Sequence, residues 1–200
     1  MSIRQPDLAV IRRAQKGDER AFAVIVRNYE APVFNYVLRM VGSRSLAEDL
    51  TQDVFLRVYQ GLRGYSLRAK FTTWLFQVAK NRVVDEMRAV ERRPRAAVTI
   101  DEMPQLEVLD APIEQSEAIA TLWRAVEELS LDLREAMLLR DIAGLSYNEI
   151  SDALNVTLAT VKWRIFKARE EVQQVLEEQG VELGVRRTSS SDEQASVRLQ

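Results

Sequence analysis

The stretch that decides the fold runs from Leu145 to Arg169 and reads LSYNEISDALNVTLATVKWRIFKAR. Ser146 and Glu149 have the spacing of a capping box, which predicts that a helix begins at this point. Asn155 suits a tight corner, because asparagine tolerates the left-handed backbone, and Thr157 can cap a second helix. Two short helices joined by a sharp corner form a helix-turn-helix, whose second helix enters the major groove of DNA.

The second helix of this pair has one apolar face and one face of unusual composition. Its apolar residues recur at helical spacing and predict the buried side: Val161, Ile165, Ala168 and Val172. Trp163 and Phe166 then point away from that side, beside lysines. Lysines suit phosphates, and large aromatic rings can pack against thymine methyl groups or sugars. The alternative is that both rings are buried against a neighbouring helix.

Composition restricts the classes of function. The 200 residues include no cysteine and no histidine, which excludes disulfides, zinc fingers, thiol nucleophiles and imidazole bases. We expect no cofactor, no metal site and no enzymatic activity. Seven glycines, five prolines and the lack of strand alternation predict an all-α chain. No apolar run reaches the length of a membrane span and no signal-peptide pattern is present, so we expect a cytoplasmic protein.

The nearly balanced net charge hides a strong asymmetry along the chain. Residues 1–95 hold 18 Lys and Arg against 10 Asp and Glu, whereas residues 96–133 hold 1 against 9. This pattern predicts a nucleic-acid surface tethered to an acidic segment. We expect a helical domain over 1–95, an acidic linker over 96–116, a helix-turn-helix domain over 117–179 and a disordered tail over 180–200.

The first domain is expected to contain several helices. Pro32 suits the start of a third helix, which Gly42 would close, and Ser45 with Glu48 has the spacing of a capping box for the next one. A loop follows from Gly61 to Lys70, and then a long helix from Phe71 to about Arg92.

Aromatic residues stand among cations where this long helix begins. Phe71 and Trp74 lie close to Arg68, Lys70 and Arg82 in the sequence. Single-stranded DNA is held in this way, by base stacking and by backbone charge. The alternative is that both aromatic residues belong to the core. We favour a DNA role for Phe71 and for the basic loop. Trp74 fits a DNA contact and a core position equally well.

Three stretches, taken in order, resemble the extracytoplasmic-function (ECF) sigma factors of bacterial RNA polymerase over residues 7–178. AEDLTQDVF at 47–55 resembles their polymerase-binding helix. FTTWL at 71–75 with AKNR at 79–82 resembles their promoter-melting and −10-reading segment. LSYNEI at 145–150, with the second helix of the motif, resembles their −35-reading helix-turn-helix. Taken alone, the acidic residues of the first stretch would fit an ordinary solvated helix start.

The resemblance implies a sigma factor that binds core RNA polymerase, recognises −35 and −10 elements and promotes DNA melting. Its implied partners are a coiled coil of the largest polymerase subunit, the beta flap, promoter DNA and an anti-sigma factor. The acidic linker would lie along the RNA path, and the alternative is that it is a plain solvated spacer. The implied −35 residues are Ser146, Tyr147, Thr160, Lys162, Trp163, Arg164, Phe166, Lys167 and Arg169. The implied −10 and melting residues are Arg68, Lys70, Phe71, Thr72, Thr73, Trp74, Asn81, Arg82, Asp85 and Arg88. The implied polymerase contacts are Glu48, Asp49, Gln52, Asp53, Leu56 and Arg57.

Two residues depart from the family pattern. Asn155 stands where the family often has glycine, and Trp163 stands where a small residue is common, so the −35 sequence cannot be copied from relatives.

Other classes of protein stay open. A stand-alone regulator would bind duplex DNA as a dimer, and a sigma mimic would keep only the polymerase surface; an enzyme would need a catalytic constellation that we do not find.

Overall fold

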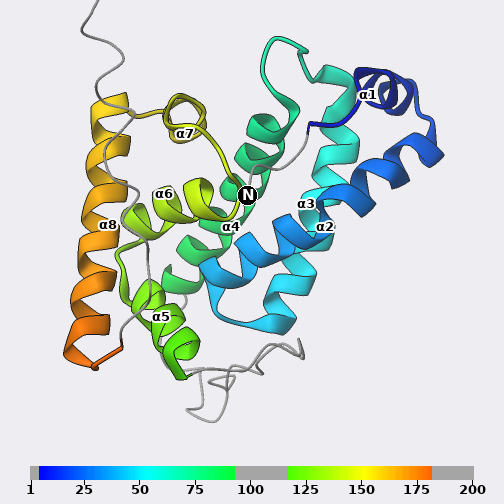
Figure 1. Ribbon diagram of the computed structural model, residues 1–200. Coiled ribbons are helices and arrows are strands. Elements are labelled where there is room, and N and C mark those ends of the chain that lie inside the picture. Colours follow the sequence, from blue (N-terminus) through cyan, green and yellow to red (C-terminus); the bar gives the residue numbers. More distant parts are fainter. Residues whose placement is uncertain (1–4, 93–116, 182–200) are drawn as a thin grey trace, which may run out of the picture.

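The computed structural model describes residues 5–92 and 117–181, and within these two ranges the regular structure is entirely helical (Figure 1). This confirms the all-α prediction for the described residues. The acidic linker lies outside them, as does the tail beyond Val181. The helices are α1 (Leu8–Gln15), α2 (Glu19–Val41), α3 (Arg44–Gly61), a short 3-10 turn η1 (Leu62–Gly64), α4 (Phe71–Arg92), α5 (Glu117–Glu128), α6 (Leu131–Asp141), α7 (Tyr147–Leu154) and α8 (Leu158–Glu178).

Helices α2 and α3 correct two predictions about where helices begin. The first concerns α2. It runs unbroken through Pro32, so no separate helix begins there. An interior proline costs about 3 kcal/mol, but Tyr29 and Val33 on either side of it are fully buried, and their burial favours one continuous helix. The next helix, α3, is capped by Ser43, whose hydroxyl accepts a hydrogen bond from the Leu46 amide, and not by Ser45.

The helix-turn-helix forms as its local sequence predicts. Ser146 and Glu149 make both hydrogen bonds of the capping box at the start of α7. Asn155 ends α7 in the left-handed conformation, with φ 53° and ψ 47°. The hydroxyl of Thr157 then accepts a hydrogen bond from the Thr160 amide and begins α8. Gly180 and Val181 close α8, so the first two residues of the expected tail belong to a helix cap.

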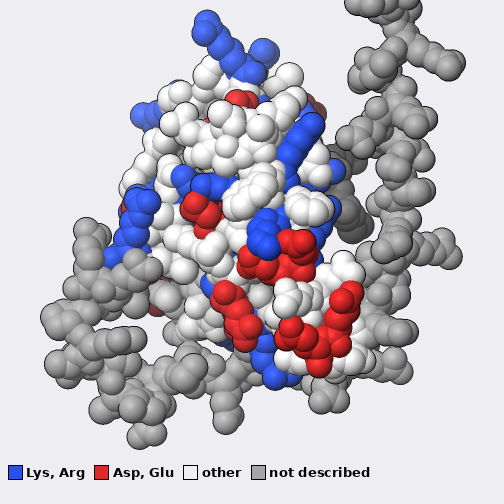
Figure 2. All heavy atoms as spheres, turned by 90° about the vertical axis from the view of Figure 1, so that its left-hand side faces the viewer, with Lys and Arg blue, Asp and Glu red and all other residues white. Residues whose placement is uncertain are grey.

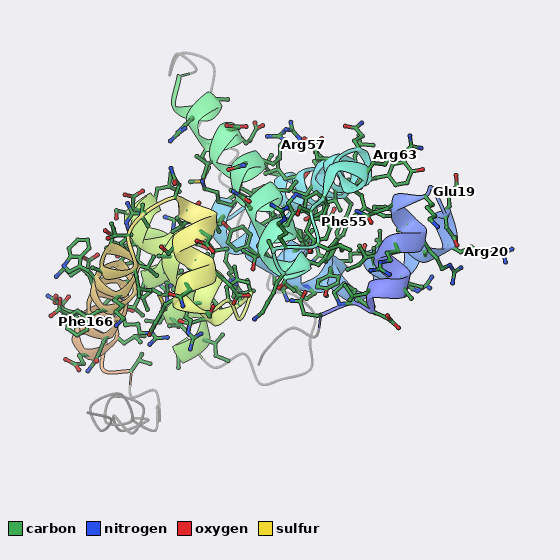
Figure 3. The ribbon with its side chains drawn as sticks, turned by 90° about the horizontal axis from the view of Figure 1, so that it is seen from above. Glu19, Arg20, Phe55, Arg57, Arg63 and Phe166 are labelled. Atoms are coloured by element: carbon green, nitrogen blue, oxygen red, sulfur yellow. The ribbon has the colours of Figure 1, made fainter. Side chains whose placement is uncertain are left out.

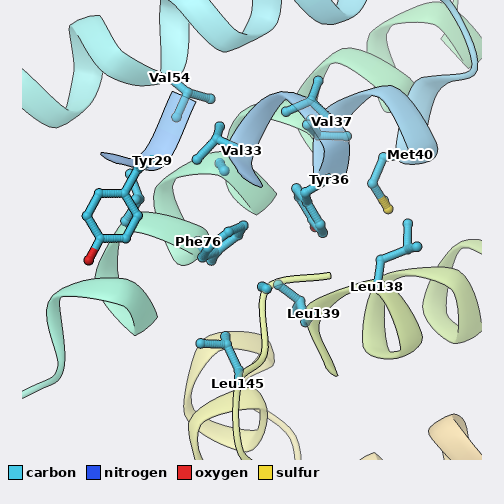
Figure 4. Packing of buried hydrophobic residues seen from close by; sticks show 14 of the residues in the cluster. Tyr29, Val33, Tyr36, Val37, Met40, Val54, Phe76, Leu138, Leu139 and Leu145 are labelled. Atoms are coloured by element: carbon cyan, nitrogen blue, oxygen red, sulfur yellow. The ribbon is translucent and has the colours of Figure 1, made fainter. Parts of the chain in front are cut away.

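The N-terminal helices and the C-terminal helices share one apolar core. Tyr36, Val37 and Met40 on α2 face Leu138 and Leu139 on α6 (Figure 4). Further along, α4 packs against α7, and α2 packs against α5. Helix α8 lies along the outer side of the C-terminal helices, where one of its faces is open to solvent (Figure 1).

Polar contacts also join the two groups of helices. The Arg134 guanidinium on α6 donates to the carbonyl oxygen of Met40 at 2.9 Å and to those of Glu127 and Leu129 at the end of α5 and just after it. The Arg39 guanidinium lies 3.7 Å above the ring of Trp123. Arg134 therefore ties the end of α2 to the end of α5, a role that nothing in the local sequence indicates.

Candidate nucleic-acid and polymerase interface

Helix α8 presents two large aromatic side chains to solvent. Val161, Ile165, Ala168 and Val172 are buried, as their spacing predicts. Trp163 is 59% exposed and Phe166 is 66% exposed, so the alternative that these rings are buried against a neighbouring helix is wrong. Figure 3 shows Phe166 at the outer edge of α8, pointing away from the rest of the protein. Exposed large apolar side chains next to one another indicate an interaction surface.

Most of the cations predicted to reach DNA from α8 already contact a carboxylate. Arg164 forms an ion pair with Asp132 and its side chain is only 16% exposed. Lys167 contacts Glu170 at 2.7 Å, and Arg169 contacts Asp141 at 2.7 Å. Lys162 differs from these three, because it is exposed and has no ion pair within the described ranges.

The remaining −35 candidates have structural roles within the motif. Ser146 is engaged in the capping box, and Tyr147 is half-buried with the Arg140 guanidinium 5.0 Å from its ring centre. The Thr160 hydroxyl is 2.8 Å from that of Thr157. These side chains hold the two helices in place, and the most open part of the face is formed by Lys162, Trp163 and Phe166.

Phe71 is a core residue, contrary to the expectation that it meets DNA. It is 1% exposed, and its ring centre lies 5.5 to 5.7 Å from those of Tyr29, Tyr65 and Trp74. Such aromatic clusters stabilise a core through burial and edge contacts. Trp74 is half-buried at the border of this cluster, so its ring keeps a solvent-facing part.

The two threonines that follow Phe71 are also buried. Thr72 accepts a hydrogen bond from Gln5, and the Thr73 hydroxyl donates to Oε1 of Glu149 at 3.2 Å. The Lys70 ammonium lies 3.1 Å from the same Glu149 oxygen. The segment predicted to read the −10 element therefore contacts the capping residue of the helix-turn-helix.

The exposed −10 candidates lie on the basic loop and on one side of α4. Arg68 and Lys70 on the loop are exposed, as are Asn81, Asp85 and Arg88 at intervals that place them on one helical face. Arg82 differs, because its half-buried guanidinium pairs with Asp53 on α3 and with Glu86. The hydrogen bond from Arg82, followed by the charge of Arg57, holds the pKa of Asp53 below its ordinary value although burial opposes this.

The predicted polymerase contacts share one face of α3. Leu56 is 55% exposed at its centre, and Tyr59, a residue that sequence reasoning missed, is 40% exposed one turn away. Exposed polar residues surround this leucine: Glu48, Asp49, Gln52 and Arg57. An apolar centre within a polar rim is the usual anatomy of a protein interface. Spacing could have identified Tyr59, since it lies three residues after Leu56 on the same helix.

Sequence reasoning also missed a buried carboxyl group between the two sets of helices. Glu135 on α6 is 5% exposed, and one of its oxygens has no hydrogen-bond partner. Burial is the main cause that raises the pKa of Glu135 to about 7, while Lys80 on α4 acts in the opposite direction. Tyr36 is fully buried near this carboxyl, and burial together with the Glu135 charge raises its pKa well above the ordinary value.

Neither a metal site nor a membrane-spanning segment is found in the part of the chain that the structure describes. Residues 5–92 and 117–181 contain no cluster of three or more side chains able to hold a metal ion. None of the helices in these ranges combines the length and apolarity needed to cross a bilayer.

Comparison with known proteins finds two family models that match this chain. Residues 25–93 match the family model of sigma-70 region 2, and residues 119–172 match that of sigma-70 region 4. The chain is 30% identical over 187 residues to RNA polymerase sigma-H factor of Pseudomonas aeruginosa, covering 88% of this chain and 97% of that protein. It is 32% identical over 182 residues to the ECF RNA polymerase sigma-E factor of Escherichia coli (strain K12), covering 86% and 95%.

A solved structure adds support for the fold. The sigma factor RpoE from Bartonella quintana, in complex with the anti-sigma factor NepR, aligns with a TM-score of 0.66 at 22% identity, over 78% of this chain and 96% of that one. A region 2 unit followed by a region 4 helix-turn-helix defines a sigma factor, which directs bacterial RNA polymerase to promoters. The chain belongs to the ECF family of these transcription initiation factors.

Proposed function

We propose that this sigma factor binds core polymerase through α3 and reads the −35 element through α8. The basic loop and the exposed side of α4 would act at the −10 element, with residues 1–95 and 117–179 as the two functional domains. The observation that carries this division is the pair of open faces, one centred on Leu56 and the other on Trp163 and Phe166. The protein would act in the cytoplasm and perform no covalent chemistry.

The α3 face supports a protein partner and not DNA. Glu48, Asp49 and Gln52 make its rim mostly acidic and amide, and the cation Arg57 is paired with Asp53, so the rim would repel a phosphate backbone. Its apolar centre, Leu56, can enter a pocket on a partner helix. These properties fit a coiled coil of the largest polymerase subunit, as the family resemblance implies.

We also propose an anti-sigma partner that covers one or both faces. The Bartonella quintana protein, which shares this fold, was solved in complex with such a factor. The exposed apolar residues on α3 and α8 are surfaces that a partner of this kind could cover.

Run-off transcription tests the proposal. Core polymerase is incubated with and without this protein on a library of promoter fragments, and its affinity for the protein is measured separately. Leu56→Asp should weaken core binding by about 30-fold or more, the factor expected for an interface hot spot. Leu8→Asp is the matched control, because Leu8 is equally exposed, at 56%, but lies on α1. This variant should stay within about twofold of the wild type.

An equal change of core affinity in Leu56→Asp and Leu8→Asp, or no change in either variant, would reject the α3 face as the polymerase contact.

A further inference from the structure

Trp163 and Phe166 form an apolar pair whose exposure requires an explanation. They are the two most exposed large hydrophobic residues in the described ranges. Three positions apart on α8, they lie on the same side, with about 5 to 6 Å between their Cβ atoms. Both lie in the first three turns of the second motif helix, which is the part that contacts base edges in this class of DNA-binding motif.

The arginines of α8 are poorly placed to read guanine. Bidentate recognition of guanine needs a free guanidinium fork. Arg164 is largely covered and paired with Asp132, and Arg169, which is paired with Asp141, lies beyond the first three turns of α8. Charge-assisted pairs of this kind must be broken before the fork can reach a base. Lys162, which has no such pair within the described ranges, can contact a phosphate as a point charge.

Charge limits the length of α8 that can approach DNA. Beyond Phe166 the cations Lys167 and Arg169 are paired with carboxylates, and the exposed surface then becomes acidic through Glu170, Glu177 and Glu178. Figure 2 shows this change along the face, with acidic side chains gathered over the lower part where the C-terminal half of α8 lies. Phosphates are repelled from that half, so contact is confined to the turns that carry the two aromatic rings.

We propose that Trp163 and Phe166 read the 5-methyl groups of thymine, so that A·T pairs define the −35 positions facing these rings. The inference rests on the proposed function of α8. The thymine methyl is the one apolar group that bases present in the major groove, and apolar side chains contact it. A spacing of about 5 to 6 Å between the two residues matches one to two base-pair steps of about 3.4 Å. The two thymines would therefore be adjacent or separated by one pair, and Lys162 would hold a neighbouring phosphate.

The test removes the methyl group and nothing else. Holoenzyme with this protein first selects −35 sequences from a randomised library, and each thymine of the selected element is then replaced by deoxyuridine. We expect binding to fall about fourfold at one or two positions, the factor that corresponds to burial of one methyl group. We then replace the same T·A pair by a C·G pair. DNA that carries 5-methylcytosine at that position should bind better than DNA that carries plain cytosine.

Variants assign the effect to the two rings. With Trp163→Ala or Phe166→Ala, the deoxyuridine effect at the corresponding position should shrink to less than about 1.5-fold, as expected when one partner of a contact is already absent. Ile119→Ala, which truncates an exposed apolar residue on α5, should keep the full effect.

Three outcomes would overturn the inference. The first is selection of G·C pairs at every position protected by α8, and the second is a deoxyuridine effect that is unchanged in both ring variants. The third is that Trp163→Ala and Phe166→Ala lose affinity for a protein partner and keep their affinity for DNA, which would assign this face of α8 to that partner. Failure of the proposed function itself looks different, because no promoter-specific transcript would then form on any selected sequence.

Discussion

Arg134 offers the most direct test of how the two groups of helices are held together. Arg134→Met keeps the aliphatic stem but removes the donors that serve the carbonyl groups of Met40, Glu127 and Leu129. Hydrogen bonds from a charged donor contribute about 1.5 to 3 kcal/mol each. Part of this loss is offset, because burial lowers the pKa of Arg134 and the variant no longer has to desolvate that charge. We expect a net loss of about 2 to 4 kcal/mol in the free energy of unfolding.

Urea and thermal denaturation followed by far-UV circular dichroism would measure this loss. For a chain of this size the melting temperature should fall by about 5 to 15 °C. Arg169→Met is the matched control, because it removes an exposed arginine ion pair from the same helical unit, and it should cost less than about 1 kcal/mol. A free energy of unfolding for Arg134→Met within about 0.5 kcal/mol of the wild type would refute the role assigned to this side chain.

Three further predictions concern the corner, the cap and the buried carboxyl group. Asn155→Ala should lower the free energy of unfolding by about 1 to 2 kcal/mol, because alanine is strained in the left-handed backbone. Asn155→Gly should melt within about 2 °C of the wild type, since glycine adopts this backbone freely. Equal melting temperatures for the alanine and glycine variants would contradict this explanation. Glu149→Gln should keep the capping box through its amide oxygen, lose the ion pair to Lys70 and turn the Thr73 hydrogen bond round, so that the Thr73 hydroxyl accepts from the amide. This should cost about 1 kcal/mol or less, and Glu149→Ala should cost about 1 kcal/mol more in the same denaturation assay. The pKa of Glu135 is about 7 in the folded protein against an ordinary value of 4.5, so its contribution to stability is present below pH 4.5 and is lost as the pH rises through about 7. The loss should amount to at most about 3 kcal/mol, and denaturation of Glu135→Gln across this window should lack it; an unchanged pH profile would exclude Glu135 as its source.

Local signals were sufficient in the helix-turn-helix, where the physical cause is itself local. The capping box at Ser146 and Glu149, the left-handed Asn155 and the apolar spacing of α8 depend on residues within one or two turns of each other. Pro32 shows the limit of such reasoning, because burial of α2 against distant helices outweighs the local cost of proline.

Sequence reasoning failed where two environments require the same residue types. A base-stacking aromatic and a core aromatic both stand among large apolar residues, and nearby cations do not distinguish them. Phe71 proved to be in the core, through rings from Tyr29 on α2 and Tyr65 after η1. The roles of Arg134 and Glu135 could not be found at all, since Met40 and Lys80, which they meet, lie on helices far away in the sequence.

The contact between Lys70 and Glu149 has a consequence for the proposed promoter reading. It joins the loop before α4 to the cap of α7 across 3.1 Å. Elements named −35 and −10 lie about 25 base pairs apart, or about 85 Å of straight duplex at about 3.4 Å per pair. One molecule therefore cannot read both elements at once while this ion pair and the Thr73 hydrogen bond persist. The 24 residues between α4 and α5 can span at most about 80 to 85 Å when extended, so the length of the chain permits the two groups of helices to separate. Separation would break the contacts of Arg134 and expose the shared apolar core, and these losses are its free-energy cost.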